Sequence, residues 1–232
     1  MIISHKHRFI FIKTKKTAGT SLEVFLSQHC GDRDVVTPIS PPVPPHQPQN
    51  HEGYFNPLPE IFFRYQDGRN LKPVFEKLQK RERFYNHLPG YLIRTRVSRS
   101  VWQNYFKFCV ERNPWDKTIS FYYMLQRSRR DPEFTFDDYL ALGNFCLNYP
   151  YYMDAEGKKV IVDRVLHYEN LNQELAEVFD QLGIPFDGSL GVWAKSNNRK
   201  DRRPYQEFYT AEQRDRVTEA FQKEIELHGY QF

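Results

Sequence analysis

A short apolar run near the N-terminus, Phe9-Ile-Phe-Ile12, is the feature that most constrains the fold. The run is unbroken rather than alternating, which is typical of a strand buried on both faces of a parallel sheet. Polar and small residues follow it from 13 to 20, and residues 21–26 then place apolar side chains at helical spacing. We therefore expect a strand, a tight loop and a helix, with Thr20 or Ser21 as the helix N-cap.

The same alternation of strands and helices continues along the chain. Residues 106–110 are the second strand candidate, and Asn113-Pro114 predicts a helix that extends to about 127, with Asn113 as its N-cap. Another strand is expected within 160–166. Further helices are expected over 71–84, 88–97, 171–182 and 211–228, and Gly183 is the expected C-cap of the third. The pattern predicts one α/β domain of 232 residues, with a central parallel sheet flanked by helices.

Residues 38–60 interrupt this alternation with a proline-rich insertion. Proline fixes φ and lacks an N–H donor, so it excludes a regular helix or a central strand. We expect an extended, partly polyproline-like segment, either a surface excursion or a mobile flap. The eight prolines are Pro38, Pro41, Pro42, Pro44, Pro45, Pro48, Pro57 and Pro59.

Charge and cysteine content exclude several classes of protein. Lys and Arg outnumber Asp and Glu by 33 − 29 = 4, and basic clusters alternate with acids, so we expect no nucleic-acid partner. The three cysteines are too scattered for a disulfide framework or a zinc site, and we expect buried thiols in a reducing compartment. The apolar segment at the N-terminus is too short for a signal peptide or a membrane span. We therefore expect a complete cytoplasmic protein without a membrane partner.

The loop between the first strand and its helix, residues 13–21, is the candidate site. Backbone N–H groups at a helix N-terminus bind anions, and small residues let an anion approach the backbone closely. Lysine adds positive charge there, and Ser or Thr adds hydroxyl donors. The alternative is an ordinary turn with solvated lysines. The residues expected to contact the anion are Lys16, Thr17, Ala18, Gly19, Thr20 and Ser21.

The loop does not follow the Walker A pattern of metal-dependent nucleotide-binding proteins. In that pattern Lys follows the last Gly and precedes a Ser or Thr that binds Mg²⁺. Here Lys16 precedes Gly19, and no apolar strand ends in an Asp suited to bind a metal ion. We therefore expect an anion site that works without a metal.

Two segments resemble the donor-binding motifs of sulfotransferases that use 3′-phosphoadenosine-5′-phosphosulfate (PAPS), especially the carbohydrate-type branch. Lys16-Thr-Ala-Gly-Thr-Ser21 is similar to the 5′-phosphosulfate loop, although Lys15 stands where the family usually has Pro. The segment 111–123 is similar to the 3′-phosphate segment, with Arg112 at a strand end and Ser120 eight positions later. An Arg side chain offers a planar fork for a phosphate, but this one could instead pair with Glu111 or Asp116.

The resemblance extends to two further regions. Asn86-His-Leu-Pro-Gly90 is similar to the region that supplies the catalytic base in related glycan sulfotransferases, which makes His87 the candidate base. The alternatives are a structural histidine that caps the following helix, and Glu111 or Glu169 as a carboxylate base. In relatives, a loop near the C-terminus folds over the adenosine 3′-phosphate. Its expected nucleotide contacts here are Arg199, Lys200, Arg202 and Tyr205.

The resemblance implies a P-loop-type fold of three layers and transfer of a sulfuryl group from PAPS to an acceptor hydroxyl, with adenosine 3′,5′-bisphosphate (PAP) as product. Lys16 is expected to serve catalysis, and Arg112 and Ser120 to anchor the 3′-phosphate. The expected acceptor is a glycan or another small hydroxyl-bearing substrate. A P-loop small-molecule kinase and a non-catalytic nucleotide- or glycan-binding relative are the alternatives. Aromatic side chains that could line an acceptor cleft, or equally pack the insertion onto the core, are Tyr54, Phe55, Phe62, Phe63 and Tyr65.

Overall fold

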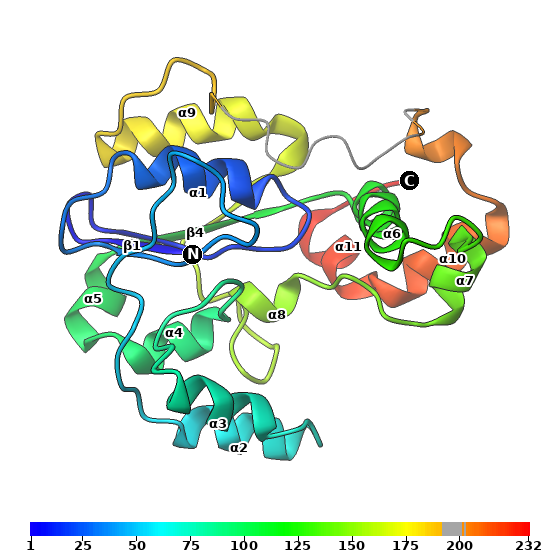
Figure 1. The fold of residues 1–232 in the computed structure, drawn as a ribbon. Helices are drawn as coiled ribbons and strands as arrows, with labels where there is room; N and C mark the ends of the chain where they lie inside the picture. The colour runs from blue at the N-terminus through cyan, green and yellow to red at the C-terminus, as the bar shows by residue number, and fades with distance from the viewer. Residues whose placement is uncertain (192–200, 202) are drawn as a thin grey trace.

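The computed structural model describes residues 1–191, 201 and 203–232, and these form a mixed sheet flanked by helices (Figure 1). The five strands of these residues lie in the order β3-β1-β2-β4-β5. As expected from the apolar runs, β2 pairs parallel with β4, and β4 pairs parallel with β5. The strands are β1 (Ile2–Ser4), β2 (Phe9–Phe11), β3 (Val35–Val36), β4 (Phe106–Glu111) and β5 (Arg164–His167).

Strand β1 does not fit the expected parallel sheet, because it pairs antiparallel with both β2 and β3. Only residues 5–8 separate β1 from β2, and a link this short joins antiparallel strands, whereas parallel strands need a longer crossover. Since β3 is antiparallel to β1, it runs in the same direction as β2. The crossover from β2 through α1 (Gly19–Ser27) to β3 therefore has β1 inserted between its two strands.

Helices cover both faces of the sheet (Figure 1). On one face, Phe11 and Phe108 pack with residues of α1 and of α9 (Leu171–Leu182). On the other face, Ile10 and Cys109 pack with residues of α4 (Gly90–Arg96) and α8 (Tyr149–Tyr152), beside α5 (Arg99–Asn104). The unbroken apolar run of β2 is thus buried on both sides, as its pattern predicts. Successive side chains of a strand point to opposite faces, so each layer receives alternate residues.

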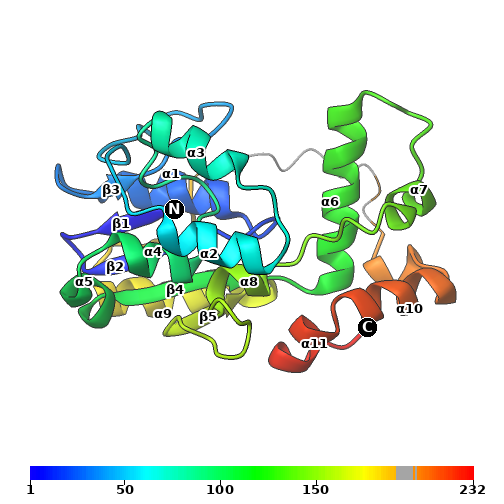
Figure 2. The same cartoon turned by 90° about the horizontal axis from the view of Figure 1, so that it is seen from below.

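Four helices gather at the edge of the sheet where the parallel strands end (Figure 2). The first follows β4 directly, and the side chain of Asn113 caps it by accepting from the N–H groups of Trp115 and Asp116. The expected helix over 211–228 is two helices, because the backbone of the buried Phe221 leaves helical geometry. The four helices are α6 (Pro114–Arg129), α7 (Phe136–Ala141), α10 (Ala211–Ala220) and α11 (Gln222–His228).

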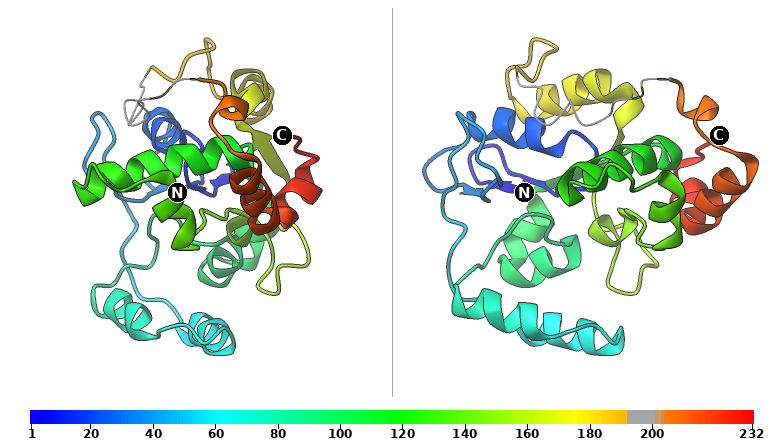
Figure 3. Two further views of the ribbon diagram at one scale, coloured as in Figure 1. Left: turned by 90° about the vertical axis from the view of Figure 1, so that its right-hand side faces the viewer. Right: turned by 45° about the vertical axis from the view of Figure 1, so that its right-hand side comes forward.

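The proline-rich insertion leads to a pair of helices that stand away from the sheet, beyond α4 (Figure 3). Residues 37–57 contain no helix or strand, apart from an isolated pairing of Gln49 with Val36. The pair consists of α2 (Leu58–Gln66) and α3 (Lys72–Gln79). The insertion ends at residue 57, three residues earlier than expected, because Pro59 lies in the first turn of α2, where proline is tolerated.

Two short 3₁₀ helices complete the described elements, η1 (Tyr168–Asn170) before α9 and η3 (Tyr205–Glu207) before α10. Helix α9 ends at Gly183 in the left-handed conformation, as its sequence predicts. In the part of the chain that the structure describes, no helix combines the length and the apolar character needed to cross a membrane.

Candidate functional site

The β2–α1 loop, residues 12–18, has an unusual backbone conformation. Lys16 and Ala18 both have positive φ, 62° and 58°, although neither is glycine. Ala18 is the N-cap of α1 and makes no side-chain capping bond, so the expected caps Thr20 and Ser21 lie inside the first turn instead. The left-handed turn at Ala18 starts the helix earlier than the hydroxyl pattern predicts. The first N–H groups of α1 are therefore not satisfied by a cap from Ala18 and lie at the positive end of the helix dipole.

Gly19 provides room for a buried lysine below this loop. A Cβ atom on Gly19 would lie 2.8 Å from Cγ of Lys13. Lys13 is buried, and its ammonium group forms an ion pair with the fully buried Glu23 of α1. The glycine that was expected to let an anion approach thus also lets the lysine pass beneath the helix N-terminus.

Threonine hydroxyls join the loop to β4. Thr14 donates to the backbone carbonyl of Val110, and its Oγ1 lies 2.8 Å from Oγ1 of Thr17. Thr17 is 1% exposed, so its hydroxyl belongs to the frame of the loop. A contact between Thr17 and a ligand stays a prediction. Thr20 is half-buried, and Ser21 is buried in the first turn of α1.

Arg112 reaches the loop from the end of the neighbouring strand. Its Nη1 donates a hydrogen bond of 3.1 Å to the carbonyl oxygen of Lys16. Its Nε and Nη2 donate to one carboxylate oxygen of Asp116, at 2.8 Å and 2.6 Å, and its guanidinium lies 4.2 Å from the centre of the Tyr168 ring. The pairing with Asp116 that the sequence left open is therefore present. These contacts use three of the five guanidinium N–H groups.

Ser120 lies on the same side of α6 as Asp116, one turn further from the strand end. Its side chain is half-buried. Within the described residues, no hydrogen bond joins Ser120 to the β2–α1 loop. The structure thus brings Arg112, but not Ser120, into direct contact with the loop.

His87 lies beside the first residues of the loop. Its Nδ1 is 3.1 Å from the backbone carbonyl of Lys13. A carbonyl can only accept, so Nδ1 carries the proton and Nε2 keeps the lone pair. Burial, and then the positive charge of Lys13, lower the pKa of His87 to about 3, so the ring is neutral near pH 7. The helix that follows is capped by Pro89, so the alternative in which His87 caps that helix is wrong.

The two carboxylates considered as alternative bases have other partners. Glu111 is fully buried and accepts from the N–H of Arg112, from Lys117, from Asn148 and from Tyr152. A buried carboxylate with four donors cannot approach an acceptor hydroxyl, so Glu111 is excluded as the base. Glu169 is exposed and accepts from the backbone N–H of Asn113 at 2.7 Å, at the start of α6.

A buried ion network under the site was missed by the sequence analysis. The ammonium group of Lys117 lies 2.7 Å from Glu111 and 2.5 Å from Glu224, and all three side chains are fully buried. Burial alone would lower the pKa of Lys117, but the two carboxylates raise it. Burial and the Glu111 carboxylate raise the pKa of Glu224 to about 7. The network links the end of β4 to α6 and to the C-terminal helix α11.

The expected nucleotide contacts near the C-terminus are only partly described. Tyr205 stacks parallel to Trp115, with ring centres 6.5 Å apart, and its hydroxyl accepts from the side chain of Asn113. It therefore stands at the start of α6, next to the residue that follows Arg112 in the chain. Arg199, Lys200 and Arg202 lie outside the described residues.

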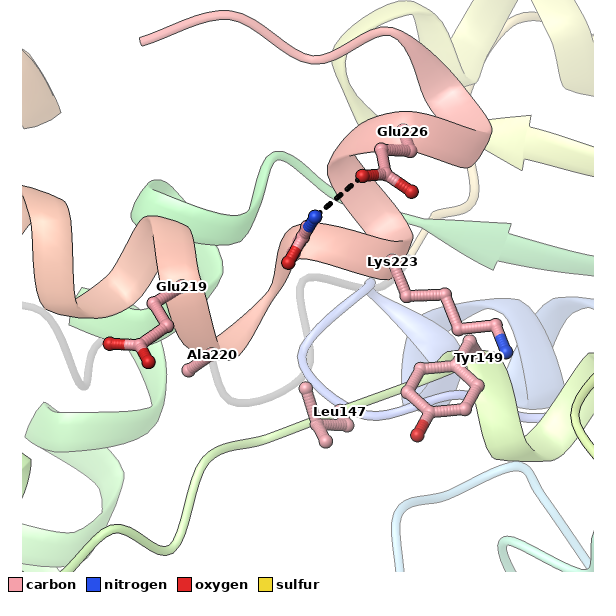
Figure 4. A pocket seen from close by; sticks show the side chains of 7 residues that line it. Leu147, Tyr149, Glu219, Ala220, Lys223 and Glu226 are labelled. Atoms are coloured by element: carbon pink, nitrogen blue, oxygen red, sulfur yellow. Dashed lines mark hydrogen bonds between the residues drawn. The ribbon is translucent and has the colours of Figure 1, made fainter.

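Two other regions of the molecule bear on ligand binding, the aromatic residues near the insertion and a separate pocket. Of the five aromatic residues in the insertion and α2, three are more than half exposed (Tyr54, Phe62 and Tyr65), Phe63 is half-buried and Phe55 is buried. A separate pocket of about 380 Å³ contains none of the candidate site residues (Figure 4). It is lined by Leu147, Tyr149, Glu219, Ala220, Gln222, Lys223 and Glu226. Among the described residues, no group of three or more His, Cys, Asp or Glu is arranged to hold a metal ion.

Comparison with known proteins finds a relative of undescribed activity. No protein-family model matches the chain. An uncharacterized protein of the archaeon Archaeoglobus fulgidus is 35% identical over 118 residues, a match that covers 49% of this chain and 98% of the archaeal protein. The match thus includes nearly all of the relative and about half of the chain.

Proposed function

We propose that this chain, which belongs to the same protein family as the uncharacterized archaeal protein, is a sulfotransferase that moves a sulfuryl group from PAPS to an acceptor hydroxyl. The observation that carries the proposal is the hydrogen bond from Arg112 to the carbonyl of Lys16. Each residue comes from a segment that resembles one half of a PAPS site, and the two are 96 positions apart in the chain. Their contact supports a single site that receives both ends of one nucleotide.

The proposed donor site is of the P-loop type. The β2–α1 loop leads into a helix whose N-terminus has no side-chain cap, and the adjacent parallel strand β4 ends beside it. Lys16 and the loop amides would stabilise the charge on the leaving 5′-phosphate. Arg112 would use its remaining N–H groups on the 3′-phosphate, with Ser120 and the stretch that includes Arg199, Lys200, Arg202 and Tyr205.

The proposed transfer forms one bond and breaks one bond. Nε2 of His87 takes the proton of the acceptor hydroxyl as the acceptor oxygen attacks sulfur. The bond between sulfur and the 5′-phosphate oxygen breaks, and PAP leaves with the electron pair of that bond. Burial, and after it the positive charge of Lys13, lower the pKa of His87 to about 3. A bound polyanion offsets positive charge nearby, so we expect the His87 pKa to rise in the complex.

The acceptor in this proposal is a carbohydrate hydroxyl. The partly exposed aromatic side chains of the insertion and of α2 support this choice, because sugars stack on exposed aromatic rings through their C–H faces. Tyr54 and Tyr65 are the most exposed of them, at 72% and 78%.

The test is a calorimetric titration of the protein with PAP and, separately, with ATP and Mg²⁺. We expect PAP to bind without metal and more tightly than ATP with Mg²⁺, and the protein would then be screened with PAPS and a panel of sugars. Preference for ATP with Mg²⁺ would overturn the proposal in favour of a kinase. Binding of PAP without turnover of any hydroxyl acceptor would indicate a non-catalytic relative.

A further inference from the structure

Asn148 is a fully buried residue that contacts both backbone polar groups of Lys15. Its Oδ1 accepts from the Lys15 N–H at 2.9 Å, and its Nδ2 donates to the Lys15 carbonyl at 3.0 Å. Lys15 immediately precedes Lys16 in the β2–α1 loop. The Asn148 side chain, just before α8, thus satisfies both the N–H and the carbonyl of Lys15, as the backbone of a neighbouring strand would do.

The same amide group also contacts the end of β4. Nδ2 of Asn148 donates to Oε1 of Glu111 at 3.0 Å, and this oxygen also accepts from the backbone N–H of Arg112 at 2.9 Å. The backbone N–H of Asn148 in turn donates to Glu224. Three partners, the N–H and the carbonyl of Lys15 and the Glu111 carboxylate, permit only one orientation of the Asn148 amide.

The loop that Asn148 holds is in a conformation that needs support. Left-handed φ values at Lys16 and Ala18 are unfavourable for residues other than glycine, and such values persist where the surrounding structure enforces them. Asn148 holds the residue before Lys16, and Arg112 holds the carbonyl of Lys16 itself. Together they determine the direction in which the loop presents its amides.

We infer that Asn148 is a positioning residue. It fixes the position of the β2–α1 loop relative to Arg112, and donor binding requires that arrangement. The inference rests on the proposed function for the identity of the donor. It does not depend on a contact between Asn148 and the nucleotide, because the side chain is buried below the loop and acts through Lys15 and Glu111.

The test compares Asn148→Ala and Asn148→Ser with the control Gln49→Ala. Gln49 is also an amide side chain that donates to two backbone carbonyls, those of Gly31 and Asp34, in a loop at the other end of α1. For each variant we would measure the melting temperature, the dissociation constant for PAP and the hydrogen exchange of the Lys15 amide. Serine is included because it is small and polar and too short to bridge to Lys15, so it supplies a second variant if the alanine protein does not fold.

We expect both Asn148 variants to bind PAP at least about tenfold more weakly, because two hydrogen bonds to the loop are lost. The Lys15 amide should exchange faster in both. The Gln49 variant should keep the affinity of the original protein, even if its melting temperature falls as much. A folded Asn148 variant with unchanged PAP affinity would overturn the inference, and so would an equal loss in the Gln49 variant. If the original protein does not bind PAP, the proposed function fails, and the Lys15 exchange rate still decides whether Asn148 holds the loop.

Discussion

The guanidinium group of Arg112 donates a hydrogen bond of 3.1 Å to the backbone carbonyl of Lys16. It thereby connects the ends of two adjacent parallel strands, β2 and β4, at the edge of the sheet where the candidate site lies. The same guanidinium is held from the other side by Asp116. A ligand that binds between the two segments would therefore meet an arginine that is already oriented, and little side-chain entropy would be lost on binding.

Arg112→Lys should weaken PAP binding about 10- to 100-fold, the range expected from loss of a hydrogen bond to a charged group. Lysine keeps the charge, but a single ammonium cannot pair with Asp116 through two nitrogens and also reach the Lys16 carbonyl. Calorimetry with PAP measures the effect. The control is Arg164→Lys at the start of β5, where the guanidinium pairs with Glu177 on α9. Equal affinity of the Arg112 variant and the original protein would count against a role of Arg112 in the donor site.

Lys16→Ala should reduce kcat with PAPS by about 100-fold or more, because a positive charge at the leaving phosphate stabilises the transition state. The melting temperature should change little, since Lys16 is a half-buried loop residue. The matched control is Lys158→Ala, an exposed lysine in a turn that pairs with Glu156. Near-normal turnover by the Lys16 variant would remove this residue from the proposed catalytic machinery.

Gly19→Ala should destabilise the fold by about 1–3 kcal/mol, the usual cost of an overpacked site. The added Cβ would lie 2.8 Å from Lys13 Cγ and 3.4 Å from the Thr14 carbonyl, so the buried Lys13, which pairs with Glu23, must shift. Urea unfolding measures the change. Gly31→Ala is the control, because there the nearest atoms of Lys6 are 3.7 Å away. If both variants unfold at the same urea concentration, the steric argument fails.

The low pKa of His87 predicts a loss of stability in acid. Burial and the charge of Lys13 lower this pKa to about 3 in the folded protein, against 6.5 for an unperturbed histidine. Between these values the unfolded chain binds a proton that the folded protein does not, so stability should fall as the pH is lowered from about 6.5 toward 3. The variant His87→Asn, in which Asn tolerates the positive φ of this position, should show a weaker fall. The free energy of unfolding in urea, measured across this pH range for both proteins, tests the prediction. The same pH dependence in both proteins would contradict the low pKa of His87.

Lys117→Met should lower the free energy of unfolding by about 3–5 kcal/mol, because removal of the lysine leaves buried carboxylates without their counter-charge. The two carboxylates are Glu111 and Glu224, both fully buried. The measurement is the free energy of unfolding in urea. The exposed Lys158→Met provides a comparison, with an expected change below about 1 kcal/mol. A small effect at Lys117 would show that the network contributes little to stability.

Several elements could be predicted because their signals lie within a few residues of the feature. The unbroken apolar run at 9–12 predicted β2, and the largely apolar segment 106–110 predicted β4. Asn113 and Gly183 predicted a helix start and a helix end. The start of α1 was predicted less well. Hydroxyl residues favoured a cap at 20 or 21, but a left-handed Ala18 begins the helix, because a buried lysine and a tight loop constrain the backbone there.

The sequence by itself determined the strand–loop–helix unit, the positions of Lys16, Arg112 and His87 at the ends of predicted elements, and the absence of a Walker A pattern. Only the tertiary structure decided that β1 is inserted antiparallel, that Arg112 contacts Lys16, and that Asn148 and the Lys117 network support the loop. The physical reason is distance along the chain. Propensities and caps act within one or two turns, whereas Asn148 and Lys15 are 133 positions apart, and their pairing exists only because the packed core brings them together.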